Sequence, residues 1–304
     1  MDNFDHLHPA VQPLLDLPKA ERAGRMLTDR FISHERVTPI LDHVDFLRLR
    51  PQQTRAAGLV VSGRPGSGKT MLARAVLRRC PPQPAEGGQP ATWPVLSISM
   101  TGAREAKILY NRILSQLEVP DPGRYVGSDR ERMVLKVCKA AGVRLLIVDE
   151  IQDILTSTAR QQRIALDTIK FLMNELSLPI LALGTAQAPE AMKVDEHLNA
   201  RFTYRTLPVW KHDQYLANFL DALERSLPLR EPSHLSSLPL STTILRLSEG
   251  VLDVIVRLVT HAAAHALEQG KEAISPGLIT CAYERPPVAA VRAAPTSAAI
   301  AKAA

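Results

Sequence analysis

The residues with the clearest chemical meaning form a glycine-rich loop after a short apolar segment, residues 57–62. The loop fits the pattern G-x-x-x-x-G-K-[ST] between an expected strand and an expected helix. Glycines let backbone N–H groups turn toward phosphates, Lys69 can reach the β and γ oxygens, and the Thr70 hydroxyl can bind magnesium. The pattern predicts a loop that binds ATP with Mg²⁺. The residues expected at the nucleotide are Gly63, Arg64, Pro65, Gly66, Ser67, Gly68, Lys69, Thr70 and Met71.

A second motif places two carboxylates directly after an apolar run, in the sequence LLIVDE at residues 145–150. This is a Walker B sequence. Asp149 is expected to hold the magnesium shell, and Glu150 to polarise the water that attacks the γ-phosphate. A scaffold that holds ATP without turnover is the alternative, but it has no evident use for Glu150. The two motifs together predict ATP hydrolysis.

Apolar runs that alternate with helical patterns predict a parallel α/β sheet that positions these motifs. The expected strands are residues 57–62, 95–100, 143–148, 179–183 and 202–207. After residue 211 only helical patterns follow. The chain therefore divides into a helical extension (1–50), an α/β nucleotide-binding core (51–210), a small helical lid (211–284) and a disordered Ala/Pro tail (285–304).

Composition limits the class of protein and of partner. The 304 residues are 45% hydrophobic and 22% charged, and no long apolar run or basic leader occurs, which favours a soluble cytoplasmic protein without a membrane partner. Three cysteines without a CxxC pair favour neither a disulfide framework nor a zinc site. A net charge of +6 is compatible with nucleic acid, and 4% aromatic residues are few for single-strand stacking, so duplex DNA is the expected partner.

Several segments resemble the TniB-type AAA+ ATPases of bacterial transposons, which are relatives of the TnsC-type target-selection regulators. The resemblance covers most of the chain and implies an AAA+ type P-loop NTPase with a five-stranded parallel sheet and flanking helices. The segments that carry it are ERAGRMLTDRFISHERV, GLVVSGRPGSGKTML, SISMTGAREAKILYNRILSQL, LLIVDEIQDIL, LALGTAQA and SEGVLDVIVRLVTHAAAHALEQGKEAIS.

The resemblance also implies partners. Such a protein would be bacterial, form a homo-oligomeric ring or filament on double-stranded DNA with ATP, select the target and recruit or stimulate a DDE-type transposase. A TniQ-type targeting protein is a further expected partner. ATP hydrolysis would then drive disassembly.

Further roles follow from the family pattern. Thr185, after the strand that ends in Gly184, is the expected sensor. Arg201 stands where such proteins carry an arginine finger for the neighbouring subunit, with Arg205 as the competing candidate. The lid departs from the family pattern at residues 250–253, which leaves Arg257 as a substitute for a second sensor arginine.

The residues expected to contact DNA are Arg104 and Lys107, which follow the second expected strand. A solvated helix face is the competing interpretation of this pair. A replication helicase loader or an initiator-like AAA+ ATPase would share every nucleotide-binding residue named above and is the main alternative function. A small-molecule kinase is disfavoured because residues 212–247 contain few arginines.

Overall fold

The apolar runs of the chain form one parallel sheet in a computed structural model, which describes residues 4–51, 55–86 and 91–288. All pairings among its five strands are parallel, and the strand order is β2-β3-β4-β1-β5. The strands are β1 (Gly58–Gly63), β2 (Val95–Ser99), β3 (Leu145–Asp149), β4 (Ile180–Gly184) and β5 (Phe202–Leu207). Every residue of β1 and β4 is buried, as expected for inner strands of a sheet covered on both faces.

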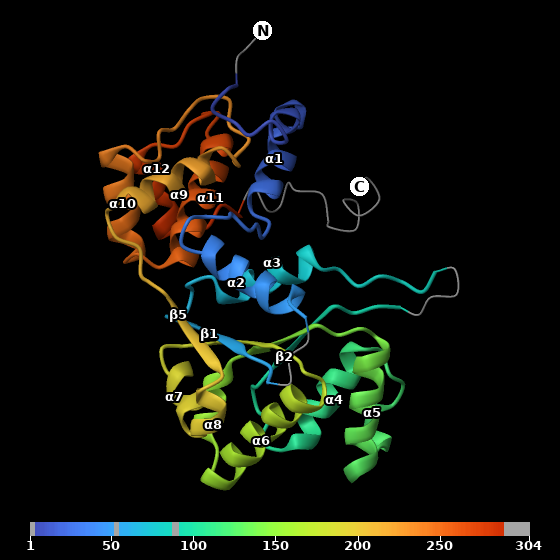
Figure 1. Cartoon of the computed structure of the whole chain (residues 1–304). Helices are drawn as coiled ribbons and strands as arrows, with labels where there is room; N and C mark the ends of the chain where they lie inside the picture. The colour runs from blue at the N-terminus through green and yellow to red at the C-terminus, as the bar shows by residue number, and fades with distance from the viewer. Residues whose placement is uncertain (1–3, 52–54, 87–90, 289–304) are drawn as a thin grey trace. The chain divides into compact units, whose positions relative to one another are not determined.

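Helices cover both faces of this sheet (Figure 1). One face carries α2 (Thr38–Leu49) and α3 (Lys69–Arg79). The other face carries α4 (Ala106–Gln116), α5 (Gly127–Ala140), α6 (Ala159–Glu175), α7 (Ala188–Lys193) and α8 (Glu196–Asn199). This arrangement confirms the α/β fold class with a five-stranded parallel sheet and flanking helices.

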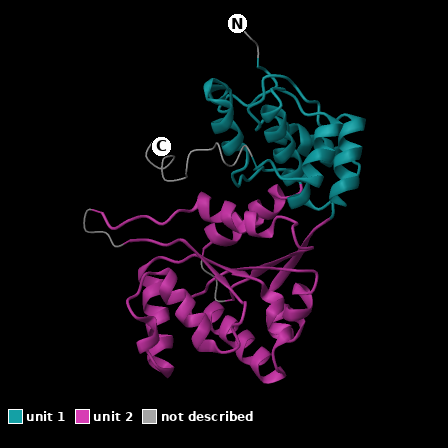
Figure 2. Cartoon of the chain, turned by 180° about the vertical axis from the view of Figure 1, so that it is seen from behind, with its two compact units in different colours: residues 1–35, 209–304 teal, residues 36–208 magenta. Residues whose placement is uncertain are grey.

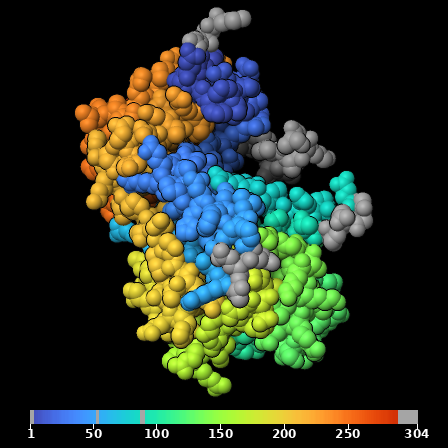
Figure 3. Space-filling model, viewed as in Figure 1, coloured from blue at the N-terminus to red at the C-terminus, as the bar shows by residue number. Residues whose placement is uncertain are grey.

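The sheet and its helices make one of two compact units, residues 36–208 (Figure 2). Its largest apolar cluster lies between the sheet and α4 to α8, with residues such as Leu114, Val148 and Leu166 almost fully buried. Helix α2, in blue, lies on the surface of this unit in the view of Figure 3. Phe46 and Leu49 on this helix are 61% and 65% exposed.

The second unit is helical and contains described residues from both 1–35 and 209–304. Its elements are η1 (Gln12–Asp16), α1 (Lys19–Met26), α9 (Gln214–Glu224), α10 (Leu238–Ser248), α11 (Leu252–Glu268) and α12 (Pro276–Glu284). The limits of the two units differ from the domain ranges expected from the sequence. The expected extension 1–50 is divided at residue 35, and its second part belongs to the unit with the sheet. Most of the expected tail lies outside the described residues. None of the described helices is long and apolar enough to cross a bilayer.

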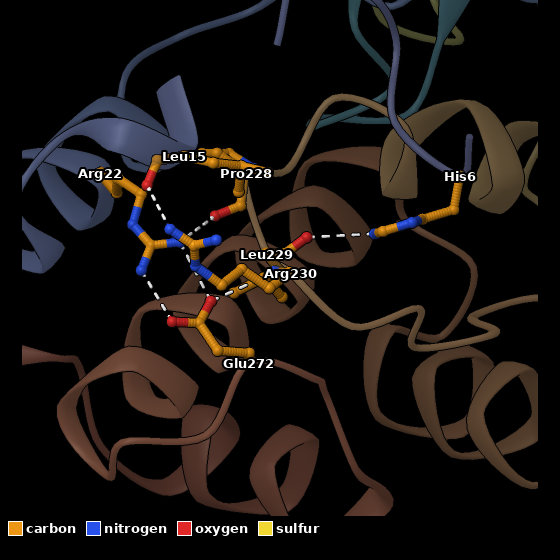
Figure 4. Close-up of polar contacts among 7 residues, drawn as sticks. All are labelled: His6, Leu15, Arg22, Pro228, Leu229, Arg230 and Glu272. Atoms are coloured by element: carbon orange, nitrogen blue, oxygen red, sulfur yellow. Dashed lines mark hydrogen bonds and ion pairs between the residues drawn. The ribbon is translucent and has the colours of Figure 1, made fainter. Parts of the chain in front are cut away.

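A buried ion pair joins α1 to the segment between α11 and α12 of this unit (Figure 4). The Arg22 guanidinium donates to both carboxylate oxygens of Glu272, at 2.7 and 3.0 Å, and to the carbonyl oxygen of Pro228 at 3.1 Å. The backbone N–H of Arg230 also donates to Glu272, and its side chain donates to the carbonyl of Leu15. Contacts so far apart in the sequence explain why residues 4–35 belong to the helical unit.

Candidate nucleotide-binding site

The parallel sheet brings the predicted motifs to one edge, the one formed by the carboxyl ends of its strands. The P-loop follows β1, the acidic pair stands at the end of β3, and Thr185 follows β4. Ser62 pairs with Gly184, and Ser99 of β2 pairs with Asp149, so these strand ends lie at the same level. The carboxyl ends of parallel strands are where open α/β sheets bind ligands.

The P-loop has the backbone conformation that its glycines allow. Gly66 and Gly68 have φ angles of 74° and 93°, in the left-handed region that residues with a side chain rarely adopt. Helix α3 then begins at Lys69, and no side chain caps its N-terminus. Its first N–H groups and the positive end of its dipole suit an anionic phosphate. The loop therefore fits a nucleotide phosphate.

Lys69 lies inside this loop and is 8% exposed. Its Nζ donates to the carbonyl oxygens of Gly63 and Arg64, at 2.9 and 3.0 Å, and to the Ser67 hydroxyl at 3.4 Å. Burial lowers the pKa of Lys69, while the charges of Glu150 and Asp149 act in the opposite direction. The ammonium group is thus surrounded by oxygen atoms and is close enough to both carboxylates to sense their charge.

The acidic pair is half-buried and turns sharply after β3. Asp149 Oδ1 accepts a hydrogen bond from the Glu150 N–H at 2.9 Å, and Glu150 has a left-handed φ of 56°. Burial raises the pKa of Asp149 above its usual range, and the Glu150 charge adds to this, against the Glu150 N–H and the Lys69 charge. A bound cation would stabilise the charged carboxylate.

Asp149 and Thr70 carry oxygen atoms of the kind that would hold magnesium. Thr70 is exposed in the first turn of α3 and offers a hydroxyl oxygen. Within residues 4–51, 55–86 and 91–288, no three His, Cys, Asp or Glu side chains gather into a metal cluster. Such a sparse set is compatible with Mg²⁺, which typically takes one or two carboxylates and completes its shell with phosphate oxygens and water.

Sequence reasoning missed Gln152, which lies in η3 (Ile151–Thr156). Its Nε2 donates to Glu150 Oε2, and its Oε1 accepts the backbone N–H of Thr185 at 2.9 Å. The residue was visible in the run DEIQ, but nothing in the sequence showed its partner 33 positions away. The Thr185 hydroxyl itself accepts from the N–H of Gln187 at 3.4 Å, beside the start of α7.

Two of the arginine candidates, Arg201 and Arg205, lie at or in strand β5. Arg201 precedes β5, and its carbonyl accepts from the N–H of Gly58 at the start of β1, so it lies at the opposite edge of the sheet from the P-loop. Its Nη1 donates to Asn174 Oδ1 at 2.6 Å. Arg205 is exposed within β5, and Arg257 is exposed on α11 in the helical unit.

Arg104 and Lys107 lie between the end of β2 and the first turn of α4, and both are exposed. Lys107 forms an ion pair with Glu105 at 2.9 Å, in which both side chains are 56% exposed. The same loop is tied to the acidic pair, because the Met100 N–H donates to the Asp149 carbonyl at 2.8 Å.

A parallel sheet in this strand order, with the P-loop, the acidic pair and the strand β4 end at one edge, defines the AAA+ class of P-loop NTPases. The family model for the bacterial TniB protein matches residues 22–212, and the chain belongs to this family. No curated protein matches the chain.

Solved structures agree with the fold. The Aeropyrum pernix ORC2 protein in ADPNP and ADP complexes is 18% identical with a TM-score of 0.63, over 86% of this chain and 71% of that one. The A. pernix ORC1 protein in complex with DNA is 14% identical with a TM-score of 0.60, over 86% and 68%. Domain III of Thermotoga maritima DnaA is 13% identical with a TM-score of 0.53, over 91% and 96%. At such identities the likeness concerns the fold alone.

Proposed function

We propose that this TniB-family protein is an ATP-dependent, DNA-binding transposition regulator. It assembles on duplex DNA with ATP, selects a target and recruits or stimulates a DDE-type transposase, and ATP hydrolysis drives its disassembly. The observation that carries the proposal is the meeting of the P-loop, Asp149 and Glu150 at one sheet edge, in a chain that the TniB family model matches.

In the proposed chemistry each side chain at the nucleotide-binding site has one role. Lys69 binds phosphate oxygens, and Asp149 with Thr70 holds magnesium, which neutralises charge on the phosphates. Glu150 accepts hydrogen bonding from the attacking water and orients it. The Glu150 carboxylate has the required support, because its backbone N–H and its side chain are both hydrogen-bonded.

Assembly would complete the site. Arg201 lies at the far edge of its own sheet, so its guanidinium would serve the γ-phosphate bound to a neighbouring copy. An arginine finger supplied in this way contributes on the order of 10³ to 10⁵ in turnover. Hydrolysis would then depend on the homo-oligomer, which is the behaviour expected of a switch that acts through assembly.

DNA contact is proposed for Arg104 and Lys107. Both are exposed, and an exposed ion pair such as that of Lys107 with Glu105 contributes little, so it can give way to a phosphate. The loop's hydrogen bond to the Asp149 carbonyl connects this surface to the ATP site. Contacts of this kind bind any duplex, because phosphates carry no sequence information.

A replication initiator or helicase loader is the second candidate, since domain III of the T. maritima replication initiation protein DnaA has a similar fold. The identities of 13 to 18% to the solved structures support the fold only, whereas the family match favours transposition. The two functions are separated by adding a transposase or a replicative helicase and measuring which one changes ATP turnover.

The first experiment measures ATP turnover with and without duplex DNA, while light scattering follows particle size. We expect DNA and ATP together to drive assembly, and Glu150→Gln to abolish turnover and trap the assemblies. Glu175→Gln is the matched control, because Glu175 is exposed on α6. Turnover that ignores DNA, with no assembly, would reject the proposal.

The second experiment tests the DNA surface with the double variant Arg104→Ala, Lys107→Ala. Removing two phosphate contacts should weaken binding to every duplex and reduce the salt dependence of log K by about two counterions. Arg160→Ala with Lys193→Ala removes the same charge at exposed positions on α6 and α7. An equal salt slope in the two double variants would exclude a specific role for Arg104 and Lys107.

A further inference from the structure

Gln152 bridges two strand ends of the nucleotide-binding edge. Its side chain is buried, with the residue 8% exposed, and both of its amide atoms are used. Oε1 accepts the Thr185 N–H at the end of β4, and Nε2 donates to the Glu150 carboxylate at the end of β3. One amide group therefore connects the carboxylate to the backbone of the neighbouring strand.

The chemistry of the partners fixes the orientation of this amide. A backbone N–H can only donate, and an ionised carboxylate can only accept. Only one of the two amide orientations satisfies Thr185 and Glu150 together, so the assignment follows from the network. Breaking it would leave the amide of the buried Gln152 side chain without partners, which is costly.

Gly184 provides the space that the Gln152 side chain occupies. A Cβ atom at this glycine would lie 2.3 Å from Gln152 Oε1 and 2.9 Å from the Ala188 Cβ. Neither distance is possible without a shift of the amide or of α7. The end of β4 is thus shaped to admit this side chain, which is a second observation in favour of a built contact.

We propose that Gln152 is a positioning residue for ATP hydrolysis, which holds the Glu150 carboxylate in its working orientation and couples it to the end of β4 at Thr185. The inference rests on the proposed ATPase function. A general base must keep a fixed geometry toward its water, and a group that engages one carboxylate oxygen leaves the other for that water.

Two substitutions separate the halves of the contact. Gln152→Glu keeps an acceptor for the Thr185 N–H but sets a second carboxylate against Glu150. Gln152→Met keeps the length of the side chain and removes both hydrogen bonds. Gln214→Met is the matched control, because Gln214 is exposed on α9 in the helical unit.

The kinetic measurement compares kcat with the affinity for a fluorescent ATP analogue. General-base catalysis contributes roughly 10² to 10⁴ in rate, so we expect both Gln152 variants to lose about tenfold or more in kcat. Affinity should stay within about twofold, because the hydrogen bonds of Gln152 go to Glu150 and Thr185, whereas Lys69 binds the phosphate. Unchanged or increased kcat in Gln152→Met would overturn the proposal.

Hydrogen–deuterium exchange at the Thr185 amide tests the coupling without any turnover. Gln152→Met should speed exchange at Thr185, whereas Gln152→Glu should leave the Thr185 N–H protected. Glu150→Ala should also speed exchange at Thr185, because the Gln152 side chain then loses its second partner and is held less firmly. Gly184→Ala, which displaces Oε1, should speed it as well. Thr185 exchange that does not respond to Glu150→Ala would overturn the coupling and show a local structural contact.

The outcomes also separate this inference from the proposed function. If wild-type protein turned over ATP no faster than Glu150→Gln, the ATPase function would be refuted, and this inference with it. Turnover that requires Glu150 but tolerates Gln152→Met would refute the inference alone.

Discussion

Removing the Glu272 carboxylate should strongly destabilise the helical unit. In the wild type the Arg22 and Glu272 side chains are 3% and 16% exposed and share two hydrogen bonds. In Glu272→Ala the buried guanidinium keeps, among its hydrogen-bond partners in the described residues, the Pro228 carbonyl at 3.1 Å. Breaking a buried pair by removing one partner costs about 3 to 5 kcal/mol. Since Glu272 retains some exposure, we expect a loss of about 3 kcal/mol in the free energy of unfolding.

Thermal and urea unfolding followed by circular dichroism measure this loss. For a chain of this size a loss of 3 kcal/mol corresponds to a Tm decrease of roughly 6 to 12 °C. The control is Glu21→Ala, which breaks the more exposed Arg25–Glu21 pair on α1 and should cost about 0.5 kcal/mol or less. Equal effects of Glu272→Ala and Glu21→Ala would refute this account of the buried pair.

The same pair predicts a pH dependence. Burial acts to raise the pKa of Glu272, but the hydrogen bonds and charge of Arg22 and the Arg230 N–H outweigh it, and the net pKa lies below the usual value. A carboxyl whose folded-state pKa is depressed contributes stability above its unfolded pKa, about 4.3, and loses it as pH falls through the folded pKa. The stability difference between wild type and Glu272→Gln should therefore be constant near neutral pH and shrink below about pH 4.3.

Three further predictions concern assembly, backbone strain and metal. Arg201→Ala subunits mixed with Glu150→Gln subunits should regain part of the ATP turnover that each variant lacks alone, because some subunit interfaces then combine an intact arginine with an intact carboxylate. Recovery in mixtures with Arg205→Ala subunits instead would identify Arg205 as the arginine finger. Gly250→Ala should lower the free energy of unfolding by more than about 2 kcal/mol, because φ is +71° and the Cβ would lie 2.2 Å from a backbone oxygen, whereas Gly270→Ala, with similar φ and open space, should cost about 1 kcal/mol. Removing magnesium with EDTA should abolish turnover, and added Mg²⁺ should restore it, as measured by phosphate release.

The sequence predicted the sheet because its strands are apolar runs with turn-forming residues at their ends. The fifth strand is found at Phe202–Leu207, as expected, and α6 begins at Ala159 directly after a Thr158–Gln161 capping box, a signal carried by neighbouring residues. Helix α4 begins at Ala106, after a turn in which Gly102 has a φ of +67°. Local signals were sufficient where the determining residues are neighbours in the chain.

Elements and contacts that depend on distant residues were not predicted. The short helices α7 and α8 have too few turns to show a periodic pattern, and the amide of Gln152 finds its role only once β3 and β4 lie side by side. The shared membership of residues 4–35 in the helical unit depends on partners more than 200 positions away, such as Pro228 and Glu272. The roles of Thr185, Arg201, Arg104 and Lys107 stay predictions.

The separation of Arg22 and Glu272 by 250 positions also sets an order of events at the ribosome. Residues 4–35 are synthesised before the nucleotide-binding unit, but their partners in the helical unit are synthesised only after it. Residues 36–208 are continuous and can fold as soon as they emerge, whereas the first segment must wait. Met26, which is fully buried in the folded protein, therefore lacks the apolar residues of 209–284 that cover it until those residues have been synthesised.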